Sequence, residues 1–346
     1  MAKRVLVAPL NWGLGHATRC IPVIHALHDL GCEVVLASDG RALDLLRLEF
    51  PSLTAVSLPS YGITYPDKMH LLQWLVQVPR LKRIIRKESE ATADLVKEHR
   101  IDCIISDNRY GVFHPEIPSA FITHQLNLPL PLLSEVVSRQ VQKLVQRFDE
   151  CWIPDVEGDQ ALSGALSAPE LTIKKKYLGL LSRFGRKKVP VANDLLAIIS
   201  GPEPDRTRFE ELVLTQLNSI PGPHVLVQGK PEAHQTKDTM GTTIYSAKWG
   251  TELNELINQS AVVVCRAGYS SIMDLVCLGK RAILVPTPHQ PEQQYLARHL
   301  ADHPQFEIQA ESDFDLAAGL ENLQGVDLEP RLLEEQLHSV IAPFLQ

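Results

Sequence analysis

The chain has 346 residues, of which 45% are hydrophobic and 22% charged, and its formal net charge is −7. At about 150 residues per domain, this length predicts two domains with enough material for a core in each. The composition excludes disorder as the dominant state, and the acidic balance argues against a nucleic-acid partner held by bulk charge.

The six cysteines indicate a reducing compartment. They include no Cys-x-x-Cys pair, and most lie in apolar runs, where a reduced thiol packs as a small hydrophobic group. The first apolar stretch, residues 5–10, is short for a signal peptide, and no run approaches the ~18–20 residues of a membrane-spanning helix. We therefore expect a cytoplasmic protein.

Short apolar runs alternate with amphipathic segments along the chain. We expect a first series of strands at residues 5–8, 33–37, 102–106, 120–123 and 151–154. A second series follows at residues 195–200, 224–228, 243–246, 261–265, 282–286 and 306–308. Helical patterns lie between strands, at residues 18–30, 251–258 and 270–278. Several runs are apolar on consecutive residues, which is typical of strands buried on both faces of a parallel sheet. The alternation predicts an α/β fold with two doubly wound, Rossmann-like domains.

The two series are separated by a stretch rich in glycine and basic residues. We place the first domain at residues 1–165, a linker at 166–193 and the second domain at 194–328. The tail at 329–346 has apolar residues near helical spacing, so we expect a terminal helix there.

The first expected strand runs into Asn-Trp-Gly-Leu-Gly-His at residues 11–16, and a helix begins directly afterwards. Gly13 and Gly15 would let the backbone approach a ligand, and the helix N-terminus offers unpaired N–H groups. His16 lies at the crest of this loop, where a neutral imidazole can act as a general base. A tight turn without a ligand is the alternative explanation of the loop. Because Asp39 lies where a ribose-binding acid would, an NAD site also stays open.

The second half carries a more specific pattern, Cys-Arg-Ala-Gly-Tyr-Ser-Ser-Ile-Met-Asp at residues 265–274. A buried strand ends here, Gly268 opens a turn, and Ser270 or Ser271 caps a new helix, whose N-terminus suits a phosphate. Asp274 lies one turn further in and can accept hydrogen bonds from two ribose hydroxyls, because an ionised Asp only accepts. A first-turn acid beside the helix dipole is the other explanation of Asp274.

This pattern, followed by Val-Pro at 285–286 and Gln-Gln-Tyr at 293–295, closely resembles the C-terminal donor-binding region of family 28 glycosyltransferases. The family includes the peptidoglycan enzyme that adds N-acetylglucosamine to lipid I. Residues 13–16 resemble its glycine-rich loop and histidine, and Ile-Thr-His-Gln-Leu-Asn at 122–127 resembles an acceptor-side stretch.

The resemblance implies the GT-B arrangement, in which two Rossmann-like domains face a cleft, with the acceptor on the first and a nucleotide-sugar on the second. The implied donor-binding residues are Ser200, Gly201, Arg266, Gly268, Ser270, Ser271, Asp274, Gln293 and Gln294. The implied acceptor-side residues are Gly13, Gly15, His124 and Gln125. Two departures affect the donor contacts. Residues 201–204 read Gly-Pro-Glu-Pro where the family has a richer glycine loop, and Asp274 stands where it usually has Glu.

The family stabilises the leaving diphosphate with helix dipoles and basic side chains rather than with a metal ion. Arg266 is the candidate cation, unless it pairs with a structural carboxylate. The Asp-x-Asp match at residues 313–315 begins an amphipathic helix, where acids serve as caps, so we expect no metal site. His16 would deprotonate the acceptor hydroxyl and give inversion at the anomeric carbon.

We therefore expect an inverting, metal-independent hexosyltransferase that uses a UDP-sugar such as UDP-N-acetylglucosamine as co-substrate and needs no other cofactor. Its acceptor would be an unidentified hydroxyl on a lipid-linked compound or a saccharide. A UDP-sugar epimerase on the same fold, an NAD-dependent dehydrogenase and a non-catalytic nucleotide-sugar-binding protein are the alternatives.

Residues 69–87 combine apolar bulk with five cations, which would suit an anionic membrane surface. Two helices split by Pro79, with apolar sides packed on a sheet, are the simpler explanation and the one we favour.

Overall fold

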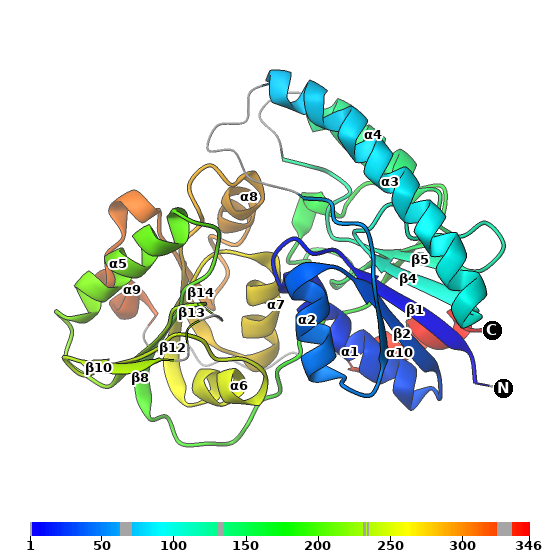
Figure 1. Cartoon of the computed structure of the whole chain (residues 1–346). Coiled ribbons are helices and arrows are strands. Elements are labelled where there is room, and N and C mark those ends of the chain that lie inside the picture. The colour runs from blue at the N-terminus through cyan, green and yellow to red at the C-terminus, as the bar shows by residue number, and fades with distance from the viewer. Residues whose placement is uncertain (1, 63–70, 130–133, 231–232, 234, 324–333) are drawn as a thin grey trace. The chain divides into compact units, whose positions relative to one another are not determined.

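Two α/β units make up the chain (Figure 1). The first unit combines Met1–Leu181 with Leu333–Gln346, and the second is Ser182–Leu332. The computed structural model describes residues 2–62, 71–129, 134–230, 233, 235–323 and 334–346. Two Rossmann-like α/β domains of the GT-B type were expected, and this fold class is confirmed.

The sheet of the first unit is entirely parallel, with strand order β3-β2-β1-β4-β5-β6-β7. Its strands are β1 (Arg4–Pro9), β2 (Glu33–Ser38), β3 (Thr54–Ser57), β4 (Cys103–Asp107), β5 (Ser119–Ile122), β6 (Glu150–Ile153) and β7 (Lys174–Tyr177). Its helices are α1 (Gly15–Asp29), α2 (Gly40–Glu49), α3 (Leu71–His99), α4 (Ser134–Val145), the short 3-10 helix η1 (Gly164–Leu166) and α10 (Glu334–Phe344).

The sheet of the second unit has the order β10-β11-β9-β8-β12-β13-β14, and only the β10–β11 pair among its neighbours is antiparallel. Its strands are β8 (Asn193–Ile198), β9 (His224–Val227), β10 (Thr236–Thr239), β11 (Thr242–Tyr245), β12 (Ser260–Cys265), β13 (Arg281–Leu284) and β14 (Phe306–Ile308). Its helices are α5 (Asp205–Leu217), α6 (Gly250–Asn258), α7 (Tyr269–Leu278), α8 (Pro291–His299), η2 (Glu311–Asp313) and α9 (Leu316–Asn322).

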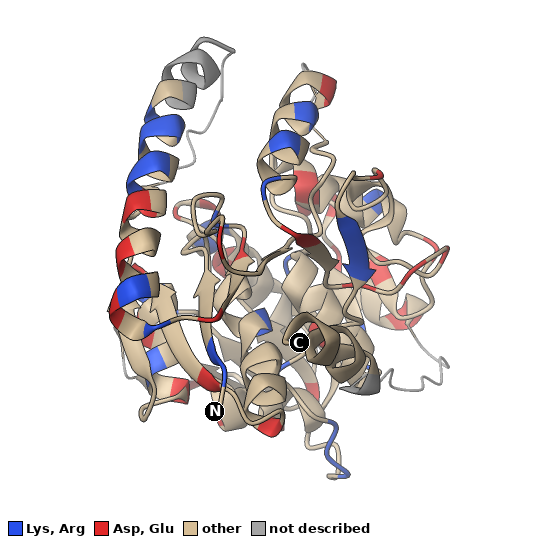
Figure 2. Ribbon diagram, turned by 90° about the vertical axis from the view of Figure 1, so that its right-hand side faces the viewer, with Lys and Arg blue, Asp and Glu red and all other residues tan. Residues whose placement is uncertain are grey.

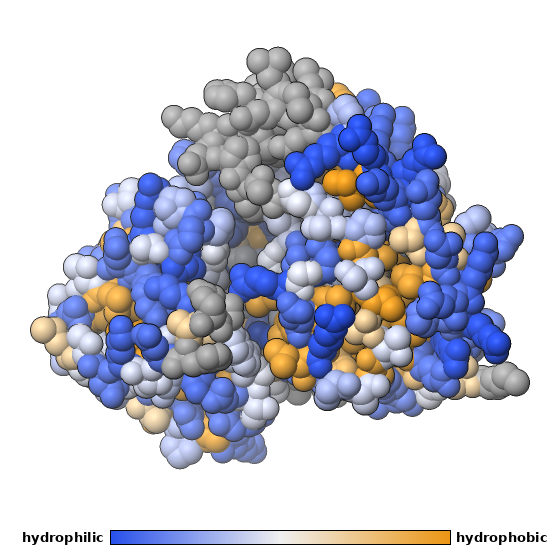
Figure 3. All heavy atoms as spheres, viewed as in Figure 1, coloured by the Kyte–Doolittle hydropathy of each residue, from blue (hydrophilic) through white to orange (hydrophobic). Residues whose placement is uncertain are grey.

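Consecutive apolar residues form the central strands because both faces of each sheet are covered. Leu6 and Ala8 of β1 pack in one cluster with Leu95 of α3, while α1 also contacts β1. In the second unit, Val262 and Val264 of β12 share a cluster with residues of α5 and α9. The surface in Figure 3 is accordingly mostly hydrophilic, with scattered apolar patches.

The segment expected as a linker, residues 166–193, contains regular structure. β7 pairs with β6 along Lys174–Tyr177 as the last strand of the first sheet, and the two units divide between Leu181 and Ser182. The helix at the end of the chain, α10, belongs to the first unit. The Phe344 ring lies 5.0 Å from that of Trp152 in β6, and Gln336 Nε2 donates to the Tyr177 carbonyl.

Helix α3 is continuous from Leu71 to His99 and contains Pro79, so the expected pair of helices split at that proline is wrong. Basic positions recur along this helix (Figure 2), and five of them have exposed side chains: Arg80, Lys82, Arg83, Arg86 and Lys87. Residues 69 and 70 of the segment considered for a membrane surface lie outside the described residues, and contact with a membrane stays a prediction. No helix in the described part of the chain has the length and apolarity to cross a bilayer.

Each sheet has a point where the chain reverses the direction in which it adds strands. In the first unit that point lies between β1 and β4, and in the second between β8 and β12. Loops that follow neighbouring parallel strands meet beyond the carboxyl edge of the sheet, and open α/β sheets bind ligands at such points. Ligand-binding residues are therefore expected at these two edges.

Candidate active site

A buried polar cluster lies at the carboxyl edge of the first sheet. His16 is in the first turn of α1, directly after the glycine loop that follows β1, and Asp107 is the last residue of β4. The His16 Nδ1 atom lies 2.7 Å from Asp107 Oδ1. Arg19, one helical turn after His16, donates to both carboxylate oxygens of Asp107, through Nε and Nη2, at 2.5 Å each. The sheet thus brings together residues that are 91 positions apart in the sequence.

The environment of Asp107 keeps its carboxylate ionised. Burial alone would raise the pKa of Asp107, but the charge of Arg19, the neighbouring His16 and their hydrogen bonds outweigh it and lower the pKa to about 2. The Asp107 side chain is 0% exposed and that of Arg19 2%, whereas that of His16 is 12% exposed. His16 is therefore the member of this trio that reaches solvent, which is the placement a general base requires.

The other residues expected on the acceptor side lie at the same edge. Gly13 has φ +73°, a left-handed conformation that favours glycine, in the loop before α1. Gly15 begins α1. His124 follows β5 and is 4% exposed, and its Nδ1 accepts from Arg19 Nη1 at 3.1 Å. The Gln125 backbone N–H donates to the Thr123 hydroxyl, and its side chain is partly exposed.

Asp39, the acid considered as a ribose ligand of an NAD site, accepts hydrogen bonds within the protein on both carboxylate oxygens. One carboxylate oxygen accepts from Arg109 Nη1 at 2.8 Å, and the other accepts from the Asn11 amide at 3.2 Å. Arg109 is fully buried and also donates to Glu88 Oε1 at 2.6 Å and to the Pro59 carbonyl. Asp39 is thus part of a buried network that ties the loops after β1, β2 and β3 to α3, which disfavours its use for a ribose.

In the second unit, the residues expected near a phosphate lie in the segments that follow β8 and β12. Ser200 and Gly201 lie just beyond β8, after one intervening residue, and Gly201 has φ +112°. Gly268 is the N-cap of α7 with extended backbone, and no side chain caps the helix there. A Cβ atom at Gly268 would have no heavy atom nearer than the Ser271 hydroxyl, at 4.0 Å. Ser270 lies with Ser271 in the first turn of α7. Space is therefore open beside Gly268 at the start of this helix.

Asp274 lies one turn into α7 and is partly buried. Its Oδ1 accepts from the Ser182 hydroxyl at 2.6 Å. Burial raises the pKa of Asp274 to about 6, although the charge of Arg183 and the Ser182 hydrogen bond act in the opposite direction. A carboxyl that is costly to ionise in the free protein gains when a ligand supplies further hydrogen-bond donors.

Arg266, the candidate cation, is paired with a carboxylate of its own unit. Its Nη1 lies 2.6 Å from Glu311 Oε2, its Nη2 donates to the Asp205 carbonyl, and its guanidinium stacks over the Phe209 ring at 4.0 Å. The side chain is 2% exposed, and burial lowers the pKa of Arg266. Arg266 therefore pairs with a structural carboxylate, and Glu311 largely neutralises the charge of its guanidinium.

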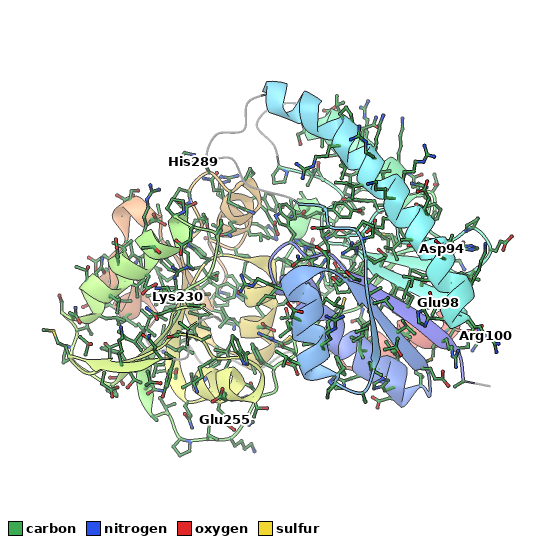
Figure 4. The ribbon with its side chains drawn as sticks, in the orientation of Figure 1. Asp94, Glu98, Arg100, Lys230, Glu255 and His289 are labelled. Atoms are coloured by element: carbon green, nitrogen blue, oxygen red, sulfur yellow. The ribbon has the colours of Figure 1, made fainter. Side chains whose placement is uncertain are left out.

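The loop after β13 is held by glutamines. Gln293 Oε1 accepts from the Thr287 backbone N–H at 2.8 Å, while the Gln293 N–H donates to the Gln290 side chain, which caps α8. Gln294 follows it with a partly exposed side chain. Gln293 thus shapes this loop, in which His289 has φ +63° (labelled in Figure 4).

Residues 206–337 match the model of the glycosyltransferase family 28 C-terminal domain. This match supports the resemblance to glycosyltransferase family 28 for the second unit. An uncharacterized glycosyltransferase of Methanopyrus kandleri is 22% identical over 293 residues, covering 79% of this chain and 83% of that protein. The UDP-N-acetylglucosamine–N-acetylmuramyl-(pentapeptide) pyrophosphoryl-undecaprenol N-acetylglucosamine transferase of Histophilus somni is 22% identical, over 69% of this chain and 68% of its own length. Among solved structures, that of LpCGTa in complex with UDP has a TM-score of 0.66, with 13% identity over 99% of each chain.

The main additions to the site of this glycosyltransferase are Asp107, Arg19 and Ser182. Asp107 follows the expected strand at residues 102–106, and a doubly wound order places that strand beside the first one, so its position was available from the sequence. Arg19 gave no such signal, because a cation in an amphipathic helix usually lies in water. In the described residues, no group of three His, Cys, Asp or Glu side chains could hold a metal ion.

Proposed function

We propose that this glycosyltransferase moves a sugar from a UDP-sugar to an acceptor hydroxyl, with inversion and without a metal ion. The observation that carries the proposal is the contact of His16 Nδ1 with the buried Asp107 carboxylate, on the edge of the sheet where the glycine loop ends. The uridine nucleotide is supported by the Histophilus relative, named for UDP-N-acetylglucosamine, and by LpCGTa with bound UDP. UDP-N-acetylglucosamine is the first donor to test.

In the proposed reaction, His16 Nε2 takes the proton of the acceptor hydroxyl, and Asp107 stabilises the imidazolium that forms. The acceptor oxygen forms its bond to the anomeric carbon as the bond from that carbon to the diphosphate oxygen breaks. The bonding electron pair leaves on the diphosphate. A single displacement of this kind inverts the anomeric carbon.

The developing charge on the diphosphate needs stabilisation by fixed dipoles. Because Glu311 neutralises Arg266, we assign this role to the backbone N–H groups at the start of α7 beside Gly268, with Ser270 and Ser271 as further donors. Asp274 would accept from the ribose hydroxyls. Of the Asp-x-Asp pair, Asp315 caps α9 by accepting from the Ala318 N–H at 3.0 Å, and we assign no metal to it.

Melting temperatures measured with a panel of UDP-, GDP- and dTDP-sugars and NAD(H) test which nucleotide the protein binds. Saturation at 100 times the dissociation constant adds about 2.7 kcal/mol of stability, which a melting curve resolves. We expect the largest shift with a UDP-sugar, its loss in Asp274→Asn, and its retention in the matched exposed control Asp302→Asn. A shift with NAD(H) alone would favour a dehydrogenase, and conversion of the UDP-sugar without an acceptor would favour an epimerase.

Turnover with a screen of saccharide and lipid-linked hydroxyl acceptors, followed as nucleoside diphosphate release, tests the base. General-base loss usually costs ~10²–10⁴-fold, so His16→Ala should reduce kcat by that amount, whereas His25→Ala, exposed on the same helix, should not. Turnover of His16→Ala within about threefold of the wild type would exclude this role. Tight donor binding with no turnover by the wild type would indicate a binding protein. The cytoplasmic location stays a prediction.

A further inference from the structure

Arg19 connects two histidines that follow different strands of the first sheet. Its guanidinium, 2% exposed, lies between Asp107, at the end of β4, and His124, just after β5. Nε and Nη2 donate hydrogen bonds to the Asp107 carboxylate, and Nη1 contacts His124 Nδ1. One buried side chain therefore contacts the group that holds His16 and also contacts His124 directly.

The contact with His124 determines where that ring carries its proton. A guanidinium only donates hydrogen bonds, so His124 Nδ1 must accept at the 3.1 Å distance to Arg19 Nη1. A ring nitrogen that accepts has no proton. His124 is therefore neutral with its proton on Nε2, which makes Nε2 a hydrogen-bond donor.

The contact with Asp107 gives His16 the opposite arrangement. An unprotonated His16 Nδ1 at 2.7 Å from Asp107 Oδ1 would oppose two lone pairs. Nδ1 must therefore carry a proton and donate it to Oδ1. Arg19 Nη2 also lies 2.9 Å from His16 Nδ1. Here, unlike at His124, a carboxylate oxygen lies closer to the ring nitrogen and accepts from both groups, so Nη2 donates to Asp107 Oδ1 and not to Nδ1. In the neutral ring, the unprotonated atom of His16 is then Nε2.

We propose that Arg19 is a positioning residue that holds His16 and His124 in opposite tautomers, with the proton on Nδ1 in His16 and on Nε2 in His124. Arg19 supplies the countercharge of Asp107, so His16 need not be protonated to satisfy the buried carboxylate. The His16 Nε2 lone pair and the His124 Nε2 proton become a fixed acceptor and a fixed donor at one edge of the sheet. The catalytic consequence rests on the proposed function of His16, but the tautomers themselves do not.

Nitrogen NMR of histidine-labelled full-length protein at neutral pH reads the tautomers directly. The chain has 13 histidines, so His16→Gln and His124→Gln identify the two signals by their disappearance. We expect the wild type to show a neutral Nδ1–H ring for His16 and a neutral Nε2–H ring for His124. A neutral Nε2–H ring at His16, or a proton on His124 Nδ1, would overturn the proposal without any change to Arg19.

Two variants then test whether Arg19 causes this arrangement. Arg19→Lys keeps a cation for Asp107 but lacks the fork that reaches Asp107 and His124 together. We expect it to fold, to change the His124 signal, and to lower transfer kcat by about 10²-fold, the cost of a small misplacement. The donor KM should stay unchanged, because the expected donor residues lie in the second unit. Arg19→Ala should regain kcat with added guanidinium, at concentrations that leave this variant folded, and regain none with ammonium.

Wild-type tautomers, kcat and KM in folded Arg19→Lys would show that Arg19 has only a structural role. The two proposals also fail differently. If His16→Ala leaves turnover intact while the tautomers are as stated, the proposed base is wrong and the role of Arg19 stands. If His16→Ala abolishes turnover but the tautomers differ, the proposed function stands and this inference falls.

Discussion

Removal of one partner of the Arg19–Asp107 pair should destabilise the first unit strongly. The Asp107 side chain is 0% exposed and that of Arg19 2%, so either single change leaves a charge without its countercharge in a dry site. Breaking a buried pair in this way costs about 3–5 kcal/mol. We expect that loss of unfolding free energy in Asp107→Asn and in Arg19→Met. The double variant should lose less than the two singles together, by up to about 3 kcal/mol, because no charge is left unpaired.

The same pair gives a pH dependence with a defined sign. The pKa of Asp107 is about 2 in the folded protein against an ordinary value of 3.8. A lowered pKa means that the folded state favours the carboxylate. Its stabilisation, about 2 kcal/mol at about 1.4 kcal/mol per pKa unit, is present above pH 4 and is lost as the pH falls toward 2. The difference in stability between wild type and Asp107→Asn should therefore narrow over that interval.

Urea unfolding followed by tryptophan fluorescence measures both effects, because Trp152 is fully buried in the first unit. Arg86→Met is the matched control. Arg86 pairs with Glu90 at 2.9 Å, but its side chain is 82% exposed, and such pairs contribute at most about 1 kcal/mol. Single variants at Arg19 and Asp107 that cost no more than this control, or a double variant with additive losses, would refute the buried ion pair.

Three other changes have expected outcomes. Because the pKa of Asp274 is raised to about 6, ligand-free stability should fall as the pH rises from about 4 to 6; Asp274→Asn should lack this slope in urea unfolding across that range. Arg109→Met should cost about 3–5 kcal/mol in the same assay, since it leaves two buried carboxylates without their cation. Gly111→Ala would place a Cβ atom 2.4 Å from the Ile85 carbonyl and should cost about 1–3 kcal/mol in thermal unfolding, whereas Gly185→Ala meets nothing within 4 Å and should be nearly neutral.

The sequence predicts the central strands of both sheets well because burial on both faces leaves a run of apolar residues. It misses strands at the edges, where burial is incomplete. β7 consists of Lys174–Tyr177, with three lysines in a row, and its charges indicated a linker. Lysine is a residue that protects edge strands from further pairing. β10, Thr236–Thr239, is exposed along its whole length and has no apolar pattern.

The candidate site also contains residues that the sequence predicts and residues that it misses. Glycines, a histidine in a loop and helix caps are local signals, so His16 and Gly268 could be chosen from a few neighbouring residues. Asp107 and Arg19 enter the candidate site through their contact with each other, across 88 positions of sequence, and no local pattern marks that contact. At Arg266 the local pattern misleads. A cation at the end of a strand predicts contact with a diphosphate, but this guanidinium pairs with Glu311, which lies 45 positions later in the chain.

Two glycines show how the structure separates packing from ligand approach. At Gly111 a side chain is excluded by the chain itself, because a Cβ atom would lie 2.4 Å from a backbone oxygen and 2.7 Å from Glu88. At Gly268 nothing in the described structure requires glycine, since its φ of −81° suits any residue and its nearest neighbour would be 4.0 Å away. The missing side chain leaves open space at the start of α7, in a unit whose Arg266 is paired with Glu311. A diphosphate that approaches the backbone closely is the occupant that would make use of that space.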